Sequence, residues 1–174
     1  MERIAVVDAA DRFLRFEPRE LVHTTHLVHR TVHIALYDRQ GRLLLQRRHA
    51  TKGTYPRCWD ISACGHVDEA DYPAGLDERL DEVYRRAGAR ELKEELGVET
   101  ALEQVAHFGP IDGVSHEQMR LFKGVSDGPY KIEPTEIEEI RAFTPVELKA
   151  LLSSSELRTL SLPFLLDYLE SNAG

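Results

Sequence analysis

The chain has 174 residues, of which 42% are hydrophobic and 30% charged, and its formal net charge is -8 at pH 7. These values are typical of one soluble globular domain with a sizeable core, and the acidic balance argues against a nucleic-acid duplex or an anionic membrane as the main partner. No apolar run approaches the length of a membrane span, and charged residues throughout positions 1–20 exclude a secretory signal. Two cysteines, Cys58 and Cys64, cannot form a disulfide framework, so we expect a cytoplasmic protein with reduced thiols, as a monomer or a homodimer.

The N-terminal part of the chain carries apolar runs bounded by turn residues, which is the pattern of strands. We expect a first strand over residues 3–7, a partner over residues 12–14 and a connection over residues 17–20. A hairpin pattern spans residues 31–46, with Asp38-Arg39-Gln40-Gly41 at its turn. The apolar runs of this hairpin predict strands that are covered on both faces by helices.

Half of the eight histidines lie close together, at His23, His26, His29 and His33. Histidine is a frequent ligand of transition metals. On a strand, His29 and His33 would share a face while His26 would point the other way, so the four cannot serve one site without a bend. The sequence leaves two interpretations open: a second metal site, or half-buried strand residues.

Basic residues follow the hairpin at Arg47, Arg48 and Lys52. Clustered cations at a strand end suit a diphosphate, because arginine can bind two phosphate oxygens at once. The alternative is a solvated basic loop. Residues 60–67 then read as one strand, whose small residues suit the wall of a site, and Cys64 within it is expected to be a small buried hydrophobe rather than a nucleophile.

The most informative run is Arg90-Glu91-Leu92-Lys93-Glu94-Glu95-Leu96-Gly97-Val98. If residues 84–96 are helical, Glu91, Glu94 and Glu95 share one face, with Ala89, Leu92 and Leu96 opposite. Gly97 would end the helix, because glycine accepts positive φ without a steric penalty. Three like charges repel one another and call for a cation, and carboxylate oxygens suit Mg²⁺ or Mn²⁺. The alternative is a solvated acidic helix with paired charges.

The C-terminal half predicts further strands and two helices. Strands are expected over residues 101–108, 119–124 and 137–143, and helices over residues 145–152 and 162–170. Thr144-Pro145-Val146-Glu147 is a capping box with proline at the first helical position. Glu117 would lie where a strand enters the sheet, facing the acidic helix or solvent.

The run from Arg90 to Val98 resembles the core of the Nudix box, the signature of hydrolases that cleave diphosphates linked to another moiety. Glu82 stands eight residues before Arg90, as the box requires, but Leu76 stands where the box has glycine, with Gly75 one place away. We interpret residues 69–80 as an insertion, and Asp77, Glu78 and Asp81 compete with Glu82 as the first box acid.

This resemblance, which extends from the histidines to Phe143, implies a single Nudix domain over residues 1–174 with an α/β/α sandwich and a curved mixed sheet. It implies Mg²⁺-dependent attack of water on a diphosphate. Glu91, Glu94 and Glu95 would bind the metal and act on the water, with Glu117 as a further metal ligand, and Arg90 would orient Glu91. A bound divalent ion lowers the pKa of water and offsets charge on phosphoryl oxygens, so the acidic spacing suits this chemistry.

One subgroup, type 1 isopentenyl-diphosphate isomerase, is similar over Trp59 to His66 and over Leu27-Val28-His29-Arg30. That resemblance implies a site in which Cys64 and Glu117 move protons across an alkene, His29 and His66 bind metal, and Arg48 and Lys52 bind diphosphate. Three features depart from the isomerase: Ser115 replaces a metal glutamate, no tyrosine lies between Tyr84 and Tyr130, and Trp59 is the only tryptophan. Aromatic rings that shield a carbocation are thus missing from the expected places.

We therefore expect a Mg²⁺-dependent hydrolase, with Mn²⁺ as a substitute, that cleaves a nucleotide or another small molecule containing a diphosphate. The isomerase is one alternative. The other, from a different class, is a module that binds a diphosphate ligand without catalysis. Specificity lies in loops such as residues 69–80, whose side-chain positions the sequence does not give.

Overall fold

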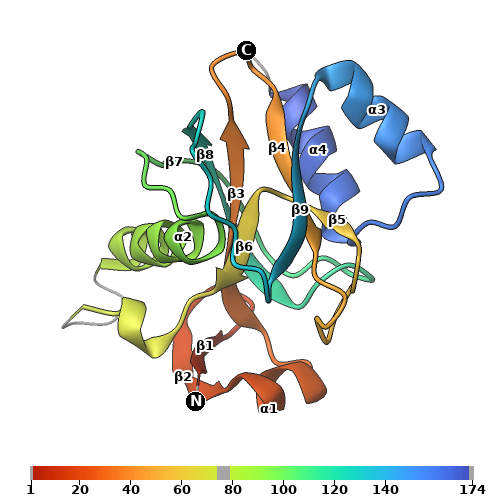
Figure 1. The fold of residues 1–174 in the computed structure, drawn as a ribbon. Helices are drawn as coiled ribbons and strands as arrows, with labels where there is room; N and C mark the ends of the chain where they lie inside the picture. Colours follow the sequence, from red (N-terminus) through yellow and green to blue (C-terminus); the bar gives the residue numbers. More distant parts are fainter. Residues whose placement is uncertain (1, 74–78, 173–174) are drawn as a thin grey trace.

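The computed structural model describes residues 2–73 and 79–172. A mixed β-sheet lies between helix α2 on one side and helices α3 and α4 on the other (Figure 1). Its strands are β1 (Arg3–Val7), β2 (Phe13–Pro18), β3 (His29–Tyr37), β4 (Leu43–Arg48), β5 (Trp59–Asp60), β6 (Ala63–His66), β7 (Glu103–Phe108), β8 (Glu117–Val125) and β9 (Ile137–Phe143). The helices are α1 (Arg19–Thr24), α2 (Leu80–Leu96), α3 (Pro145–Ser153) and α4 (Ser161–Ser171), with a short 3₁₀ helix, η1 (Glu69–Asp71).

Strand β3 is the centre of the sheet. It runs parallel to β8 over the whole of residues 29–37 and antiparallel to β6, with Thr31 opposite His66 and His33 opposite Cys64. Strand β4 continues the sheet through antiparallel pairs with β5 and β9. Because side chains alternate across a strand, this register places His33 and Cys64 on one face of the sheet and Gly65 on the other.

Two hydrophobic cores hold the layers together. Val32, Ile34 and Leu36 of β3 pack with Tyr84, Leu92 and Leu96 of α2 on one face of the sheet. Ala35 of β3 and Leu121 of β8 pack with Leu162, Leu165 and Leu169 of α4 on the other face. The expected α/β/α sandwich is confirmed. No helix within residues 2–73 and 79–172 is long and apolar enough to cross a membrane.

Most predicted elements are present, with changed limits. The hairpin of β3 and β4, strand β9 and the capping box of α3 are confirmed, and Glu147 and Thr144 satisfy each other's backbone N–H groups. The expected connection over residues 17–20 is wrong: strand β2 continues to Pro18 and α1 begins at Arg19. The single strand expected over residues 60–67 is also wrong, since Ile61 and Ser62 separate β5 from β6.

Helix α2 presents the acidic run. It ends at Gly97, whose φ of 69° confirms the expected left-handed stop, but it begins at Leu80 rather than at residue 84. Leu92 and Leu96 are buried as expected, whereas Ala89 is exposed and Ala87 lies in the core instead. The proposed insertion over residues 69–80 therefore contains η1 and the start of α2, while positions 74–78, with Gly75, Leu76, Asp77 and Glu78, lie outside the described residues.

Candidate active site

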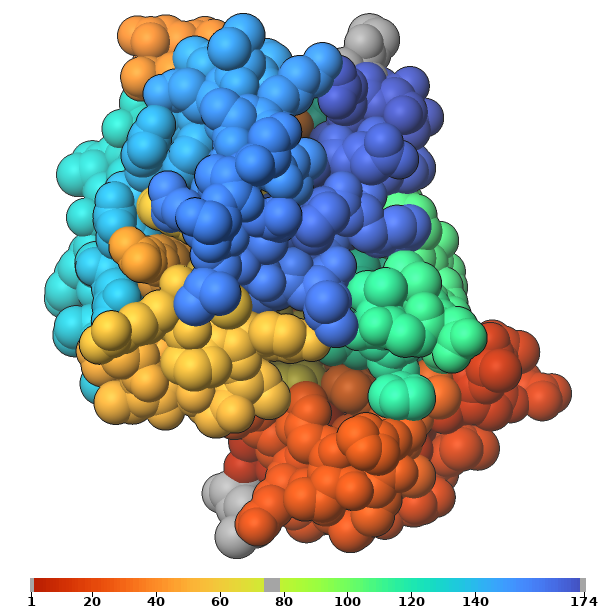
Figure 2. Space-filling model, turned by 90° about the vertical axis from the view of Figure 1, so that its right-hand side faces the viewer, coloured from red at the N-terminus to blue at the C-terminus, as the bar shows by residue number. Residues whose placement is uncertain are grey.

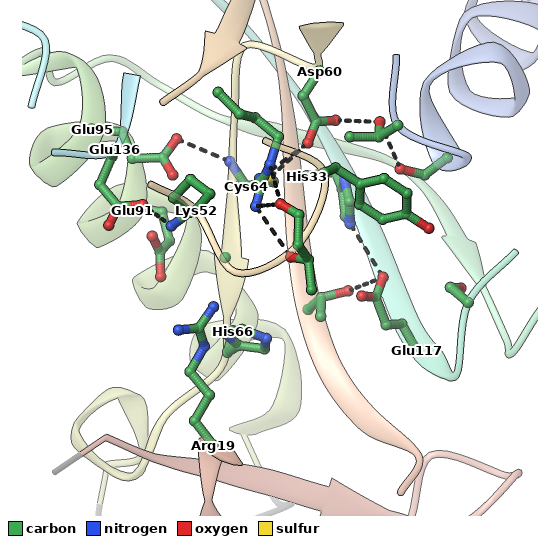
Figure 3. A pocket seen from close by; sticks show the side chains of 18 of the residues that line it. Arg19, His33, Lys52, Asp60, Cys64, His66, Glu91, Glu95, Glu117 and Glu136 are labelled. Atoms are coloured by element: carbon green, nitrogen blue, oxygen red, sulfur yellow. Dashed lines mark hydrogen bonds and ion pairs between the residues drawn. The ribbon is translucent and has the colours of Figure 1, made fainter. Parts of the chain in front are cut away.

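One cavity of about 690 Å³ collects most of the candidate residues (Figure 3). Its wall is formed by α1 and α2, by β3, β6 and β8, by the β4–β5, β7–β8 and β8–β9 connections, and by the segment that leads into α4. The cavity thus unites segments that are far apart in the sequence.

The acidic side of the cavity comes from α2. Glu91 and Glu95 are 9% and 7% exposed, and Glu94 projects further into solvent. Arg90 Nη1 donates to Glu91 Oε1 at 2.8 Å and to Glu94 Oε2 at 3.1 Å, and Gln46 Nε2 donates to Glu95 Oε2 at 2.8 Å. The second oxygen of each glutamate forms no hydrogen bond with a described residue.

Burial raises the pKa of Glu91 to about 7, against the opposing effect of the Arg90 guanidinium. It raises the pKa of Glu95 to about 8, and the neighbouring Glu91 carboxylate adds to this shift. Two desolvated carboxylates side by side are costly to ionise without a compensating cation.

Gly65 explains how Glu91 reaches the sheet. A Cβ atom at position 65 would overlap the Glu91 carboxylate, so only glycine lets this acid lie against β6. Since each of the three glutamates keeps one hard oxygen free of hydrogen bonds to described residues, the residues fit Mg²⁺ or Mn²⁺. The oxygens of the three carboxylates lie further apart than the ligand atoms of a compact metal site. Mg²⁺ does not require all three to bind it directly, because it usually keeps several water ligands.

The basic residues of the β4–β5 region separate into two groups. Arg48 and Lys52 line the cavity, where Arg48 lies 3.4 Å from Asp60 and Lys52 pairs with Glu136. Arg47 does not line it: its guanidinium lies 3.7 Å from Glu139 and 6.0 Å from the centre of the Trp59 ring. The expectation that Arg47 faces the substrate is therefore not met, because alternation along β4 turns it away from Arg48.

Glu117 lies across the cavity from α2, at the start of β8. Its Oε2 accepts a hydrogen bond from Thr31 Oγ1 at 3.3 Å and lies 3.5 Å from His33 Nε2. Burial opposes ionisation, but His33 and the other nearby histidines lower the pKa of Glu117 to about 2. Its neighbours are thus histidines, and the expectation that it joins Glu91, Glu94 and Glu95 around one ion does not match this placement.

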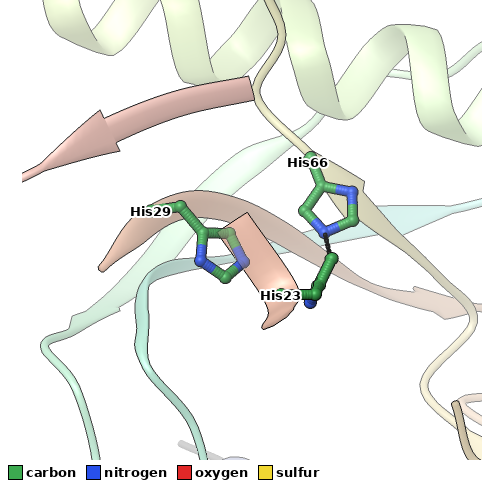
Figure 4. Close-up of side chains that lie close together, drawn as sticks. All are labelled: His23, His29 and His66. Atoms are coloured by element: carbon green, nitrogen blue, oxygen red, sulfur yellow. Dashed lines mark hydrogen bonds between the residues drawn. The ribbon is translucent and has the colours of Figure 1, made fainter. Parts of the chain in front are cut away.

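Three histidines meet beside the cavity: His23 from α1, His29 from β3 and His66 from β6 (Figure 4). Their possible ligand atoms all lie within 4.8 Å of one another, and His23 Nε2 is 3.0 Å from His66 Nε2. His29 Nε2 is buried without a hydrogen-bond partner among the described residues. Burial and the two neighbouring rings lower the pKa of His23 to about 4, so the His23 ring is a neutral donor, and imidazole nitrogens suit a transition metal.

Of the four histidines that lie close together in the sequence, only His23 and His29 belong to this group. His26 contacts His116, with ring centres 5.2 Å apart, and His33 lies beside Glu117. The bend between α1 and β3 brings His23 next to His29, and the pairing of β3 with β6 adds His66.

Cys64 borders the cavity between α2 and Asp60. Its Sγ lies 3.7 Å from Asp60 Oδ2, and its backbone N–H donates to Glu95 Oε2 at 3.3 Å. Burial, with the carboxylates of Asp60 and Glu95, raises the pKa of Cys64 well above its ordinary value. The thiol is protonated at neutral pH and is not an activated nucleophile.

Comparison with known proteins identifies the family. The model of the NUDIX domain matches residues 27–161. An uncharacterized Nudix hydrolase of Pseudomonas aeruginosa is 35% identical over 171 residues, covering 98% of this chain and 90% of the relative. The chain belongs to the Nudix family.

Other relatives agree. An isopentenyl-diphosphate Delta-isomerase of Serratia proteamaculans is 34% identical over 140 residues, 78% of this chain and 72% of the relative. A crystal structure of a Deinococcus radiodurans protein has a TM-score of 0.75 at 25% identity, covering 98% of both chains. The NUDIX domain of Shewanella oneidensis NrtR, crystallised with ADP ribose, shares the fold at 14% identity, with a TM-score of 0.61, over 91% of this chain and 100% of that one. The expected Nudix-type pyrophosphohydrolase, with its resemblance to the isomerase subgroup, is confirmed.

A further partner of Arg90 in this Nudix enzyme is Asp71. Glu82, the first box acid by spacing, lies 3.6 Å from Arg79, and Asp81 pairs with Arg120. Arg90 instead binds both oxygens of Asp71, in η1. Among the described residues, neither sequence candidate contacts Arg90.

The sequence did not single out several residues that line the Nudix cavity: Arg19, Asp60 and Glu136. Glu136 reaches α2 because Lys131 and Glu133 bond to the last carbonyls of that helix. A weak signal existed in the acids around β9, but their spacing alone did not point to the site. For Asp71, the signal was the Asp68-Glu69-Ala70-Asp71 capping pattern that forms η1.

Proposed function

We propose that this Nudix enzyme hydrolyses a diphosphate linkage in a nucleoside di- or triphosphate or a nucleotide conjugate, with Mg²⁺ as its cofactor. The observation that carries the proposal is one cavity that has Glu91, Glu94 and Glu95 on one side and Arg48 with Lys52 nearby. A diphosphate bound there would meet cationic donors, and a divalent ion would offset the remaining charge. Because both cysteines are free thiols, we assign the enzyme to the cytoplasm.

The roles follow from the contacts. Glu91 and Glu95 would hold Mg²⁺ from their buried positions, and Glu94, which is more exposed, would complete the acidic set or accept a proton from water. Arg90 would fix Glu91 and Glu94 through its hydrogen bonds to both. When bound, Mg²⁺ lowers the pKa of a coordinated water and neutralises charge on phosphoryl oxygens. Arg48 and Lys52 would orient the diphosphate.

The test is phosphate or pyrophosphate release from a broad panel of diphosphates with Mg²⁺ or Mn²⁺, using the wild type and Glu94→Gln. Glu94→Gln should reduce turnover by about 100-fold or more, since it removes a charged oxygen donor, and should leave the thermal midpoint unchanged because the side chain is exposed. Glu99→Gln is the matched control, because Glu99 is a solvent-exposed glutamate paired with Lys93. Full activity of Glu94→Gln would refute the metal assignment, and no release from any compound would favour a binding module.

The isomerase remains a second candidate, and one observation favours it. His23, His29 and His66 form a compact group beside Cys64 and Glu117, which is the arrangement that the isomerase resemblance implies for its metal and its proton donors. Protonated Cys64 suits an acid better than a nucleophile. Conversion of isopentenyl diphosphate into its double-bond isomer, followed by NMR, would establish this activity.

A further inference from the structure

An aromatic side chain stands at the mouth of the cavity in a position that the loop enforces. Tyr55 lines the cavity, yet it is 40% exposed and has a φ of 50°. A bulky residue adopts positive φ only where its surroundings hold it there. Here Arg48 Nη2 donates to the carbonyl of Thr54 at 3.2 Å, and the N–H of Cys58 donates to the carbonyl of Tyr55 at 3.3 Å. The residue that orients this loop is thus the same arginine that borders the diphosphate region.

Two more apolar side chains, from other segments, line the same cavity as Tyr55. Leu160, just before α4, is 52% exposed, and Val114 lies in the β7–β8 connection. Hydrogen bonds of 2.9 Å from the N–H of Trp59 to Leu157 and of 3.0 Å from the N–H of Thr159 to Trp59 tie the Leu160 segment to β5. Figure 2 shows the yellow β4–β5 loop, the blue segment before α4 and the green β7–β8 connection around a hollow above α1.

Polar atoms accompany this apolar surface. The hydroxyl groups of Thr159 and Ser161 lie 3.4 Å apart on the cavity wall. Ser115 Oγ, also in the wall, is buried and has no hydrogen-bond partner among residues 2–73 and 79–172. A buried hydroxyl without a partner is costly, and a ligand with a polar edge would satisfy it where a hydrocarbon chain would not.

The cavity also has room beyond a diphosphate. Its volume of about 690 Å³ is that of a site for a complete small molecule, since ligand sites span about 300–1,000 Å³. Its wall includes Lys52 and the glutamates of α2 as well as Tyr55, Val114 and Leu160.

We propose that Tyr55, supported by Leu160 and Val114, is the specificity surface for the part of the substrate beyond the diphosphate, and that this part is a planar nitrogen heterocycle, as in a nucleoside diphosphate. The ring stacks on the phenol of Tyr55, and its polar edge faces the hydroxyl groups of Ser115 and Ser161. This inference rests on the proposed function for the position of the diphosphate. It adds the residue that selects the rest of the substrate.

Binding measurements test it without turnover. Dissociation constants for ADP, inorganic pyrophosphate and isopentenyl diphosphate are measured by calorimetry with Mg²⁺, using the wild type, Tyr55→Leu and Tyr55→Phe. The wild type should bind ADP more tightly than pyrophosphate. Tyr55→Leu should raise the dissociation constant of ADP by about 10-fold, because one base-stacking contact is lost. Tyr55→Phe keeps the ring and should retain wild-type affinity for ADP, and pyrophosphate binding should be the same in all three proteins.

Two further variants complete the design. Leu160→Ala should also weaken ADP binding. It provides a second test of the surface in case Tyr55→Leu lowers the thermal midpoint and so disturbs the fold. Leu157→Ala is the control, since Leu157 is 62% exposed and does not line the cavity.

The outcomes separate the two proposals. ADP that binds no more tightly than pyrophosphate, or that is insensitive to Tyr55→Leu and Leu160→Ala, would overturn the inference. An equal loss of affinity for isopentenyl diphosphate in Tyr55→Leu and Leu160→Ala would overturn it too. The surface would then bind apolar chains as well as rings and would not select a heterocycle. Tyr55-dependent ADP binding without hydrolysis of any diphosphate would leave this inference standing and refute the proposed function.

Discussion

Arg90 and Asp71 form a two-point ion pair: Nε lies 3.0 Å from Oδ1 and Nη2 lies 2.9 Å from Oδ2. Asp71 is only 3% exposed, so solvent screens this pair little. The same guanidinium donates to Glu91, Glu94 and the carbonyl of His66. Asp71 therefore fixes the orientation of the residue that orients two of the proposed metal ligands.

Asp71→Asn should lower kcat for hydrolysis by about 10-fold, because loss of a supporting residue behind metal ligands typically costs about 10- to 100-fold. The apparent affinity for Mg²⁺ should fall with it, which separates a positioning role from a structural one. Glu82→Gln is the control, because Glu82 pairs only with Arg79 among the described residues. Equal behaviour of the two variants in a Mg²⁺ titration would contradict the role of Asp71.

Stability without metal should depend on pH in an unusual direction. The pKa values of Glu91 and Glu95 rise from 4.5 to about 7 and about 8, so the folded state holds more protons than the unfolded state between these limits. Their contribution to stability is therefore complete below about pH 4.5 and is lost as the pH rises to about 8. With EDTA, the thermal midpoint of Glu91→Gln should fall less than that of the wild type across this window.

Addition of Mg²⁺ should reverse this loss. A ligand that binds only the folded state raises the thermal midpoint, and ionised carboxylates bind Mg²⁺ more strongly than protonated ones. The midpoint should therefore rise by a few degrees near pH 8 and hardly at all near pH 5. An equal rise at both values, measured by differential scanning fluorimetry, would place the ion elsewhere.

Cys64→Ala should separate hydrolysis from isomerisation. Burial and the nearby carboxylates of Asp60 and Glu95 raise the pKa of the thiol, which keeps it protonated, so its removal should leave phosphate release within about two-fold of the wild type. Under the isomerase alternative, migration of the double bond requires a proton donor and should disappear in this variant. If phosphate release fell by about 100-fold while the fold was retained, Cys64 would have a role in hydrolysis that we do not assign.

The basic residues offer a matched pair of variants. Lys52→Gln should raise KM for a diphosphate substrate by about 10-fold, since a charge-assisted hydrogen bond contributes about 1.5–3 kcal/mol. Arg47→Gln removes the same charge five residues away, but Arg47 does not line the cavity, so KM should change by less than about two-fold. A similar increase in both would indicate a general electrostatic effect of net charge, and a titration with salt would reveal it.

Local patterns predicted much of this molecule. Alternating apolar runs located β1, β3, β4 and β9, and the capping box located α3, because these elements obey short-range rules. The acidic run of α2 led to the family through its resemblance to the core of the Nudix box. The ends of the elements were predicted less accurately, and one helix, α1, was missed. Pro18 and the polar residues after it resemble a connection, although proline commonly precedes or begins a helix.

Long-range pairing decided what local patterns could not. His66 joins His23 and His29 only because β6 pairs with β3, and Asp71 reaches Arg90 only because η1 folds back onto α2. Arg47 and Arg48 are adjacent in the chain, and only their register in the sheet shows which one faces the cavity. Spacing along one helix is encoded in a short window, whereas contacts between strands depend on the whole topology.

The parallel pairing of β3 with β8 also bears on how this enzyme is made. Its nine residue pairs, from His29 with Glu117 to Tyr37 with Val125, each close a loop of nearly ninety residues. Pairing over such separations is slow, because chain entropy is lost before the contacts form. A nascent chain on the ribosome that has reached only α2 has its acidic helix but no pocket, and activity should emerge late in refolding, after helical signal has recovered.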